Sequence, residues 1–178
     1  MIYLKYIIIG IVLLILLLIL LIVHLYNKFQ FANIKIDEAE NNIDMLQEKE
    51  YILLTRALNT LEGEELPPEL NKIKKIKTND VTHFELNDIL KKAYSSLLSL
   101  LDINEVKETE DLTEIMKNLF DNNEEMEAAV KYYNTNVTEY NKYIKCFPSN
   151  IIRLLFRYHE KEFYNDEKEV QLAILKDK

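Results

Sequence analysis

The stretch that decides the fold is YIIIGIVLLILLLILLIVHL, residues 6–25. None of its twenty residues carries a formal charge, apart from a protonated form of His24. At about 1.5 Å of rise per helical residue the run is roughly 30 Å long, the thickness of a bilayer's hydrocarbon core. A helix that is apolar on every face needs apolar partners all round, which the amphipathic remainder of the chain does not supply. We therefore expect a transmembrane helix rather than a buried core helix.

A cleaved signal peptide is the main rival interpretation of this run. Lys5 precedes the run, as the basic region of a signal peptide would. However, the run exceeds the roughly 7–15 apolar residues of a signal peptide, and bulky residues follow it where a peptidase requires small ones. We predict an uncleaved, single-pass cell-membrane anchor over residues 1–26, which includes Tyr6, Ile7, Leu14, Leu18 and Leu25. Basic residues flank the span on both sides, so the side of the membrane that the domain occupies stays open.

Composition predicts that the remaining chain is helical and acidic. The 178 residues include only two glycines and three prolines, which leaves few turns and favours long helices. All 30 acidic residues and 21 of the 22 basic ones follow the span, giving that part a net charge of −9. This charge argues against nucleic acid as a partner.

Three stripes of apolar residues predict the helices of the domain, which we place at residues 27–166. Glu50 interrupts the first stripe. No helix-breaking residue separates this stripe from the span, so the two could form one continuous helix, and a bend within residues 27–33 is the alternative. The second helix is expected from Asp80 or Thr82, because Thr82 and Glu85 form a capping-box pattern. The stripes are Ile36, Ala39, Ile43, Leu46, Leu53, Ala57 and Leu61; Leu86, Ile89, Leu90, Ala93, Leu97, Leu98 and Leu101; and Leu112, Met116, Leu119, Met126, Val130, Tyr133, Val137, Tyr140, Ile144 and Phe147.

The third stripe alternates three- and four-residue steps, with Asn123 as its exception, and indicates one long, coiled-coil-like helix. Gly63 and the prolines after it end the first helix, but whether residues 68–79 are helix or loop stays open.

Pro148 ends the third helix, and Ser149 or Asn150 is expected to cap a short apolar one at residues 151–158. That helix either plugs the end of the domain, which is the simpler explanation, or touches the bilayer through its apolar residues. Residues 167–178 are expected to form a charged, flexible tail.

Several segments of the sequence resemble a known family. IDEAENNID at residues 36–44 resembles the first bundle helix of the LemA family of bacterial membrane proteins. YNKYIKCFPSNII at residues 140–152, with the Tyr-Asn pair at 133–134, is similar to the family's most characteristic segment. The resemblance implies an all-α fold in which an antiparallel four-helix bundle follows a single span. We interpret the motif residues as structural: Tyr133, Asn134, Tyr140, Asn141, Phe147, Pro148, Ser149 and Asn150.

No catalytic, cofactor-binding or metal-binding residues are assigned. The three histidines and the single cysteine lack metal-ligand spacing, the two glycines form no phosphate-binding pattern, and no recognisable catalytic arrangement is present.

We therefore expect a non-enzymatic scaffold or interaction module whose partners are the lipid bilayer and other membrane proteins. Signal transmission through the anchor helix is the alternative, and an enzyme whose site forms only in three dimensions is a third class. The oligomeric state stays open.

Overall fold

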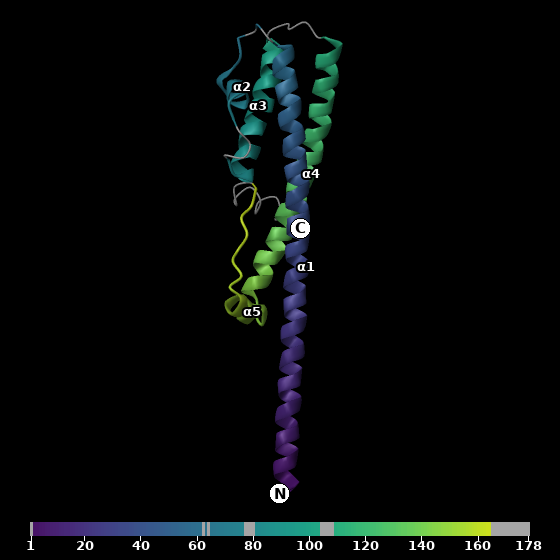
Figure 1. The fold of residues 1–178 in the computed structure, drawn as a ribbon, viewed down its shortest axis with the longest axis vertical. Helices are drawn as coiled ribbons and strands as arrows, with labels where there is room; N and C mark the ends of the chain where they lie inside the picture. Colours follow the sequence, from purple (N-terminus) through teal and green to yellow (C-terminus); the bar gives the residue numbers. More distant parts are fainter. Residues whose placement is uncertain (1, 62, 64, 77–80, 104–108, 165–178) are drawn as a thin grey trace. The chain divides into compact units, whose positions relative to one another are not determined.

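A computed structural model describes residues 2–61, 63, 65–76, 81–103 and 109–164. These residues form five helices and no strand: α1 (Ile2–Thr60), α2 (Pro68–Ile73), α3 (His83–Ile103), α4 (Glu110–Lys145) and α5 (Ser149–Phe156) (Figure 1). The predicted all-α class, with a long apolar helix at the N-terminus, is confirmed. The expected tail at residues 167–178 lies outside the described residues.

The chain divides into two compact units. Unit 1 comprises Met1–Glu38 and Asn134–Phe163, and unit 2 comprises Ala39–Tyr133 and Tyr164–Lys178. Both α1 and α4 contribute residues to each unit, and α5 belongs to unit 1 alone.

Helix α1 is a single helix of 59 residues. Of the two alternatives for residues 27–33, the structure therefore has the continuous helix and not the bend. No proline or glycine lies between Gly10 and Gly63, so the backbone meets no breaker before its end. After α1 ends at Thr60, Gly63 adopts a φ of 106°, a left-handed conformation that suits glycine in the turn.

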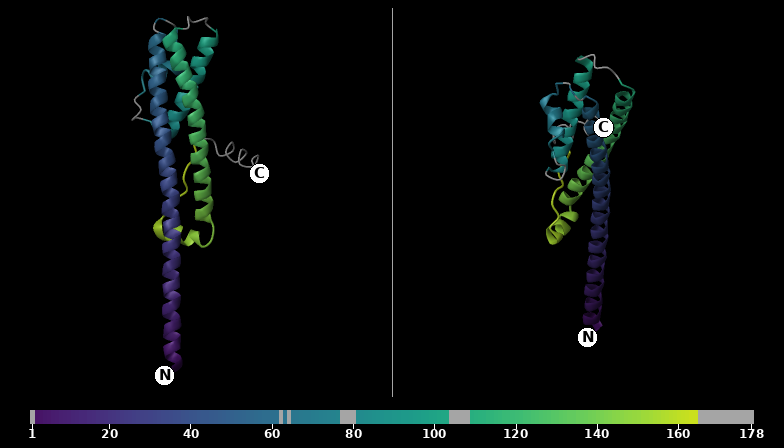
Figure 2. Two further views of the ribbon diagram at one scale, coloured as in Figure 1. Left: turned by 90° about the vertical axis from the view of Figure 1, so that its right-hand side faces the viewer. Right: turned by 45° about the horizontal axis from the view of Figure 1, so that its top comes forward.

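Unit 2 packs residues 39–60 of α1 with α2, α3 and residues 110–133 of α4 (Figures 1 and 2). Its core includes Leu54, Leu58, Leu90 and Leu97, each with no exposed surface. The open question at residues 68–79 is answered in part: α2 covers residues 68–73 and lies against α3, whereas residues 77–79 are not described.

The predicted capping box at the start of α3 is confirmed. The Thr82 amide donates to a Glu85 carboxylate oxygen over 3.1 Å, and the Glu85 amide donates back to the Thr82 hydroxyl over 3.3 Å. These bonds satisfy amide groups that the first turn of a helix leaves without intrahelical partners.

The long stripe on α4 is buried as predicted over most of its length, but two details of the prediction are wrong. The buried polar residue is Asn122, not Asn123: Asn122 has no exposed surface, and its side chain donates to the Leu46 carbonyl oxygen over 3.1 Å. Phe147 is 79% exposed, because α4 ends at Lys145 and the chain leaves the helix before the stripe's last position.

Candidate functional site

An aromatic cluster forms the centre of unit 1 around Phe29, which is fully buried. The Phe29 ring stacks on Tyr158, with centroids 4.7 Å apart and an interplanar angle of 11°. Tyr143 lies 4.9 Å from Phe29, and Tyr140 meets it edge-on at 6.1 Å. Edge and offset ring pairs of this kind are favourable beyond the area they bury. Through these ring contacts, both α4 and the chain that follows α5 pack against α1.

The chain after α5, residues 157–163, is called here the return segment. It begins at Arg157, whose φ of 56° turns the chain out of the helix. Asn141 holds the segment through two backbone hydrogen bonds: its side-chain NH₂ donates to the Lys161 carbonyl oxygen, and its side-chain oxygen accepts from the Lys161 amide, both over 2.9 Å. One buried amide side chain thus satisfies both backbone groups of a residue that lies outside regular structure.

Charged groups hold the same segment to its neighbours. Lys145 forms an ion pair of 2.9 Å with Glu160, and this contact holds the pKa of the Glu160 carboxyl below its usual value. The Lys161 ammonium nitrogen lies 3.6 Å from a carboxylate oxygen of Asp37 on α1. The Gln30 side-chain NH₂ donates to the Tyr158 hydroxyl over 3.2 Å.

The family-like motif residues divide into a buried set and an exposed set. Tyr133, Asn134, Tyr140, Asn141 and Ser149 are buried, whereas Phe147 and Asn150 are exposed and Pro148 is intermediate. The expected side-chain cap by Ser149 or Asn150 is absent: α5 begins at Ser149, after a cis Phe147–Pro148 peptide bond, without a side-chain capping bond. A helical turn instead links the corner, where the Asn150 amide donates to the Cys146 carbonyl oxygen over 2.9 Å.

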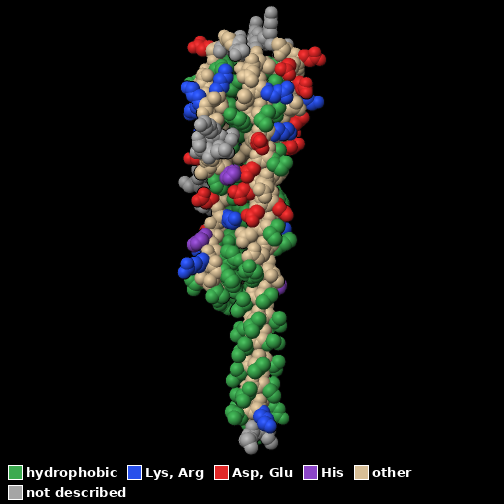
Figure 3. Space-filling view, viewed as in Figure 1, with side chains coloured by type: hydrophobic (Ala, Val, Ile, Leu, Met, Phe, Trp, Pro, Cys, Tyr) green, Lys and Arg blue, Asp and Glu red, His purple; other side chains and the backbone are tan. Residues whose placement is uncertain are grey.

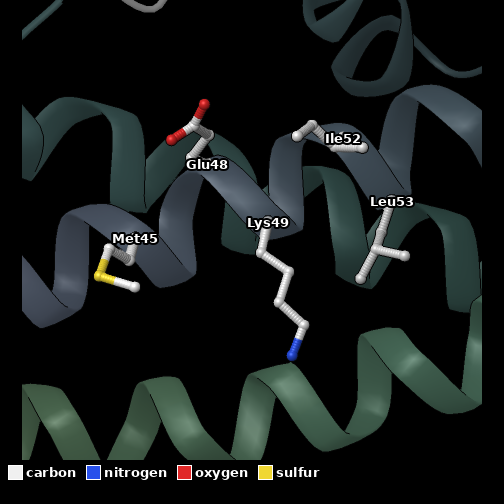
Figure 4. Close-up of a pocket in the computed structure, with 5 residues that line it drawn as sticks. All are labelled: Met45, Glu48, Lys49, Ile52 and Leu53. Carbon is white, nitrogen blue, oxygen red and sulfur yellow. The ribbon is translucent and has the colours of Figure 1, made fainter.

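A surface pocket of about 300 Å³ lies on unit 2 along α1 (Figure 4). It is lined by Met45, Glu48, Lys49, Ile52 and Leu53. Met45 is 70% exposed and Ile52 is 51% exposed. Lys49 points towards α4, where the Glu125 carboxylate lies 3.9 Å from its ammonium group. The pocket combines two exposed apolar side chains with charges of both signs.

A carboxyl group is buried inside unit 2, at the position that interrupts the first apolar stripe. Glu50 is only 3% exposed, and loss of hydration raises its pKa to about 7, although the charge of Lys91 opposes that rise. Three other buried polar residues, Gln47, Asn87 and Asn122, gave no such signal in the sequence, because an amide side chain is equally common on a helix surface.

The span predicted from sequence is exposed along nearly its whole length. Tyr6, Ile7, Leu14 and Leu18 are between 49% and 67% exposed, whereas Leu25 is 7% exposed and belongs to the packed part of unit 1. Among the described residues, α1 is the one helix long and apolar enough to cross a membrane, with a mean hydropathy of 3.6 over a window of which none is buried. Figure 3 shows hydrophobic side chains covering this part of α1 on the face in view.

Comparison with known proteins identifies the family. A model of the LemA family matches residues 70–174, more than half of the chain. The chain belongs to the LemA family. The match extends from α2 through α3, α4 and α5, and so includes the Asn141 contact and the corner at Pro148.

No curated protein and no solved structure matches this LemA-family chain. Within the described residues, no group of three or more His, Cys, Asp or Glu side chains is placed to hold a metal ion.

Proposed function

We propose that this LemA-family protein is a single-pass membrane protein whose helical domain is a non-enzymatic interaction module for other membrane proteins. The observation that carries the proposal is the exposure of the apolar run on α1. A window with a mean hydropathy of 3.6 and no buried residue has no protein partner among the residues that the structure describes. In water such a surface would be strongly unfavourable, and a bilayer is the environment that matches its length and polarity.

The surface of unit 2 supports the interaction role. Unit 2 contains 25 acidic and 14 basic residues, and its pocket places Met45 and Ile52 in solvent among charged neighbours. A partner that complements this surface would offer apolar side chains bordered by basic ones. Other membrane proteins are the partners proposed, since the anchor confines the domain to their vicinity.

Membrane fractionation of the full chain with a C-terminal tag tests the anchor. The protein is expected to stay in the membrane through an alkaline carbonate wash, and its intact mass is expected to include the residues before the span. A shorter mass, with the N-terminal residues removed, would show a cleaved signal peptide and refute the single-pass proposal.

Photo-crosslinking in intact membranes tests the interaction role. A photoreactive residue replacing Ile52 is expected to form a discrete adduct with a membrane protein, and Ile52→Glu in a competing untagged copy is expected to compete less well than wild type. The matched control places the same residue at Glu124, an exposed position on α4. Equal crosslinking from both positions would argue against the pocket as the binding surface.

Signal transmission is the second candidate, and the continuity of α1 favours it. A helix of 59 residues contains both the apolar run and core residues of unit 2, so a rotation of the span would reach that core without a hinge. Single cysteines along α1, in a Cys146→Ser background, would report such a rotation as a change in disulfide crosslinking between copies. The same crosslinking pattern under every growth condition would refute signalling and leave the interaction module.

A further inference from the structure

We propose that α5 is a second membrane contact of this protein, a short helix that lies in the headgroup region of an anionic bilayer beside the span. The proposal rests on the proposed anchor, and it adds a lipid-binding surface to it.

One face of α5 is buried, and a second face is apolar and exposed. Ser149 and Ile152 face the interior, each 2% exposed. Ile151, Leu154 and Leu155 lie together on another face, at the three- and four-residue spacing of neighbours on a helix, and are 57%, 84% and 64% exposed. An end plug would bury both faces. The structure therefore favours the bilayer alternative for this helix, because its outer face has no cover within unit 1.

The exposed face continues the apolar surface of the span. Tyr26 is the first residue after the apolar run, and its ring lies 5.2 Å from that of Phe156, the last residue of α5. This contact places the end of α5 at the level where the apolar run ends. A bilayer covering residues 6–25 would have its headgroup boundary at this level. In Figure 3 the hydrophobic side chains gather over α5 and the adjoining part of α1.

Two more tyrosines of unit 1 lie near the end of the apolar run. Tyr143 and Tyr158 belong to the aromatic cluster, and the Lys28 ammonium lies 4.4 Å from the centroid of the Tyr143 ring. Tyrosine and lysine at the end of a span are typical of the membrane interface, where a ring and a charged tip meet different environments.

The two units differ in the sign of their net charge, and the positive charge of unit 1 favours contact with an anionic lipid. Unit 1 has eight basic and five acidic residues; without Lys5, which lies at the other end of the apolar run, seven basic residues remain and the net charge is +2, whereas unit 2 has a net charge of −11. Two of the basic residues, Arg153 and Arg157, lie within α5 and directly after it. Basic side chains near a bilayer surface are attracted by acidic phospholipid headgroups. The acidity of the whole chain therefore does not describe the part that adjoins the span.

An eight-residue helix binds a membrane weakly by itself. Here the span belongs to the same unit and keeps α5 close to the bilayer surface. The effective concentration of lipid around α5 is therefore high, and a weak affinity suffices for contact.

Quenching of a fluorescent label in the full-length protein tests the proposal. The protein, in a Cys146→Ser background, is reconstituted into vesicles of phosphatidylcholine, alone or mixed with phosphatidylglycerol. A small fluorophore is attached at Leu154→Cys, an exposed position where a label disturbs little packing. We expect quenching by a nitroxide on the lipid near the headgroup and protection from aqueous iodide, with a several-fold stronger lipid effect when phosphatidylglycerol is present.

Two further labelled positions separate this inference from the anchor itself. Leu14→Cys reports the span, and Phe120→Cys reports an apolar residue of unit 2 that is 54% exposed. If the lipid nitroxide quenches position 14 while iodide quenches position 154, the α5 proposal is overturned and the anchor stands. If the lipid quenches neither position, the anchor proposal fails too.

Protection of position 154 from both quenchers would show that protein covers α5 and would also overturn the proposal. Equal lipid quenching at positions 120 and 154 would do the same, because it would show nonspecific contact. Equal quenching in the two lipid mixtures would overturn the preference for anionic headgroups.

Discussion

Glu50→Gln is expected to remove a pH-dependent loss of stability that originates inside unit 2. Glu50 is 3% exposed, and burial raises its pKa from 4.5 to about 7. The folded state therefore binds the proton more tightly than the unfolded state does. Its stabilising contribution is fully present below pH 4.5 and is lost as the pH rises through about 7. At about 1.4 kcal/mol for each pH unit between the two pKa values, the loss is about 3 kcal/mol.

Chemical unfolding of the full-length protein in detergent micelles measures this loss. The chain has eleven tyrosines and no tryptophan, so near-ultraviolet circular dichroism of the tyrosines reports tertiary packing during a guanidinium titration. At pH 4.5 the wild type and Glu50→Gln are expected to unfold with similar free energies, because both side chains are largely neutral. At pH 8 the variant is expected to be more stable by about 3 kcal/mol.

The matched control is Glu48→Gln, two residues earlier on the same helix, where the side chain is exposed. This variant should follow the wild type at every pH, because its charge keeps its hydration. The difference between the wild type and Glu50→Gln is the decisive quantity, since other titrating groups contribute equally to both. A difference that does not change between pH 4.5 and pH 8 would refute the burial of an ionisable group at this position.

Three further substitutions test unit 1 by the same unfolding assay. Phe29→Ala should cost about 3–5 kcal/mol, because it empties the centre of the aromatic cluster, whereas Phe31→Ala, at a position 60% exposed, should cost far less. Asn141→Ala should cost about 1–3 kcal/mol and speed amide exchange in the return segment, whereas Asn150→Ala, at an exposed position, should leave that exchange unchanged. Val137→Asp should cost at least about 3 kcal/mol, because it puts a charge at a position with no exposed surface, and Val137→Ala should cost less. Equal stability of Val137→Asp and the wild type would mean that the α4 stripe is wrongly placed.

The periodic spacing of apolar residues along the sequence predicted most of the helices correctly. A helix repeats its faces every three to four residues, so the spacing from Leu112 to Ile144 indicated a buried stripe before any partner was known. Capping is equally local, which is why Thr82 and Glu85 marked the start of α3. The corner after α4 was predicted from Pro148, because a missing amide acts wherever it occurs.

Two predictions about the α4 stripe failed, one at the step where the periodicity is broken and one beyond the end of the helix. The step after Leu119 allowed either Asn122 or Asn123 to face inwards, and only packing against the Leu46 carbonyl oxygen selects Asn122. Phe147 fits the spacing of the stripe, but the helix ends before it and its side chain is exposed.

The sequence by itself determined the long apolar helix at the N-terminus, the all-α class and the family, because each depends on composition, local spacing or a contiguous motif. Only the tertiary structure decided the role of individual polar and aromatic residues. It joined Asn141 to the return segment, gathered Tyr143 and Tyr158 around Phe29, and left Leu154 exposed. These outcomes depend on contacts between segments up to 130 positions apart, as between Tyr26 and Phe156. The sequence around a residue does not indicate which distant surface will cover its side chain.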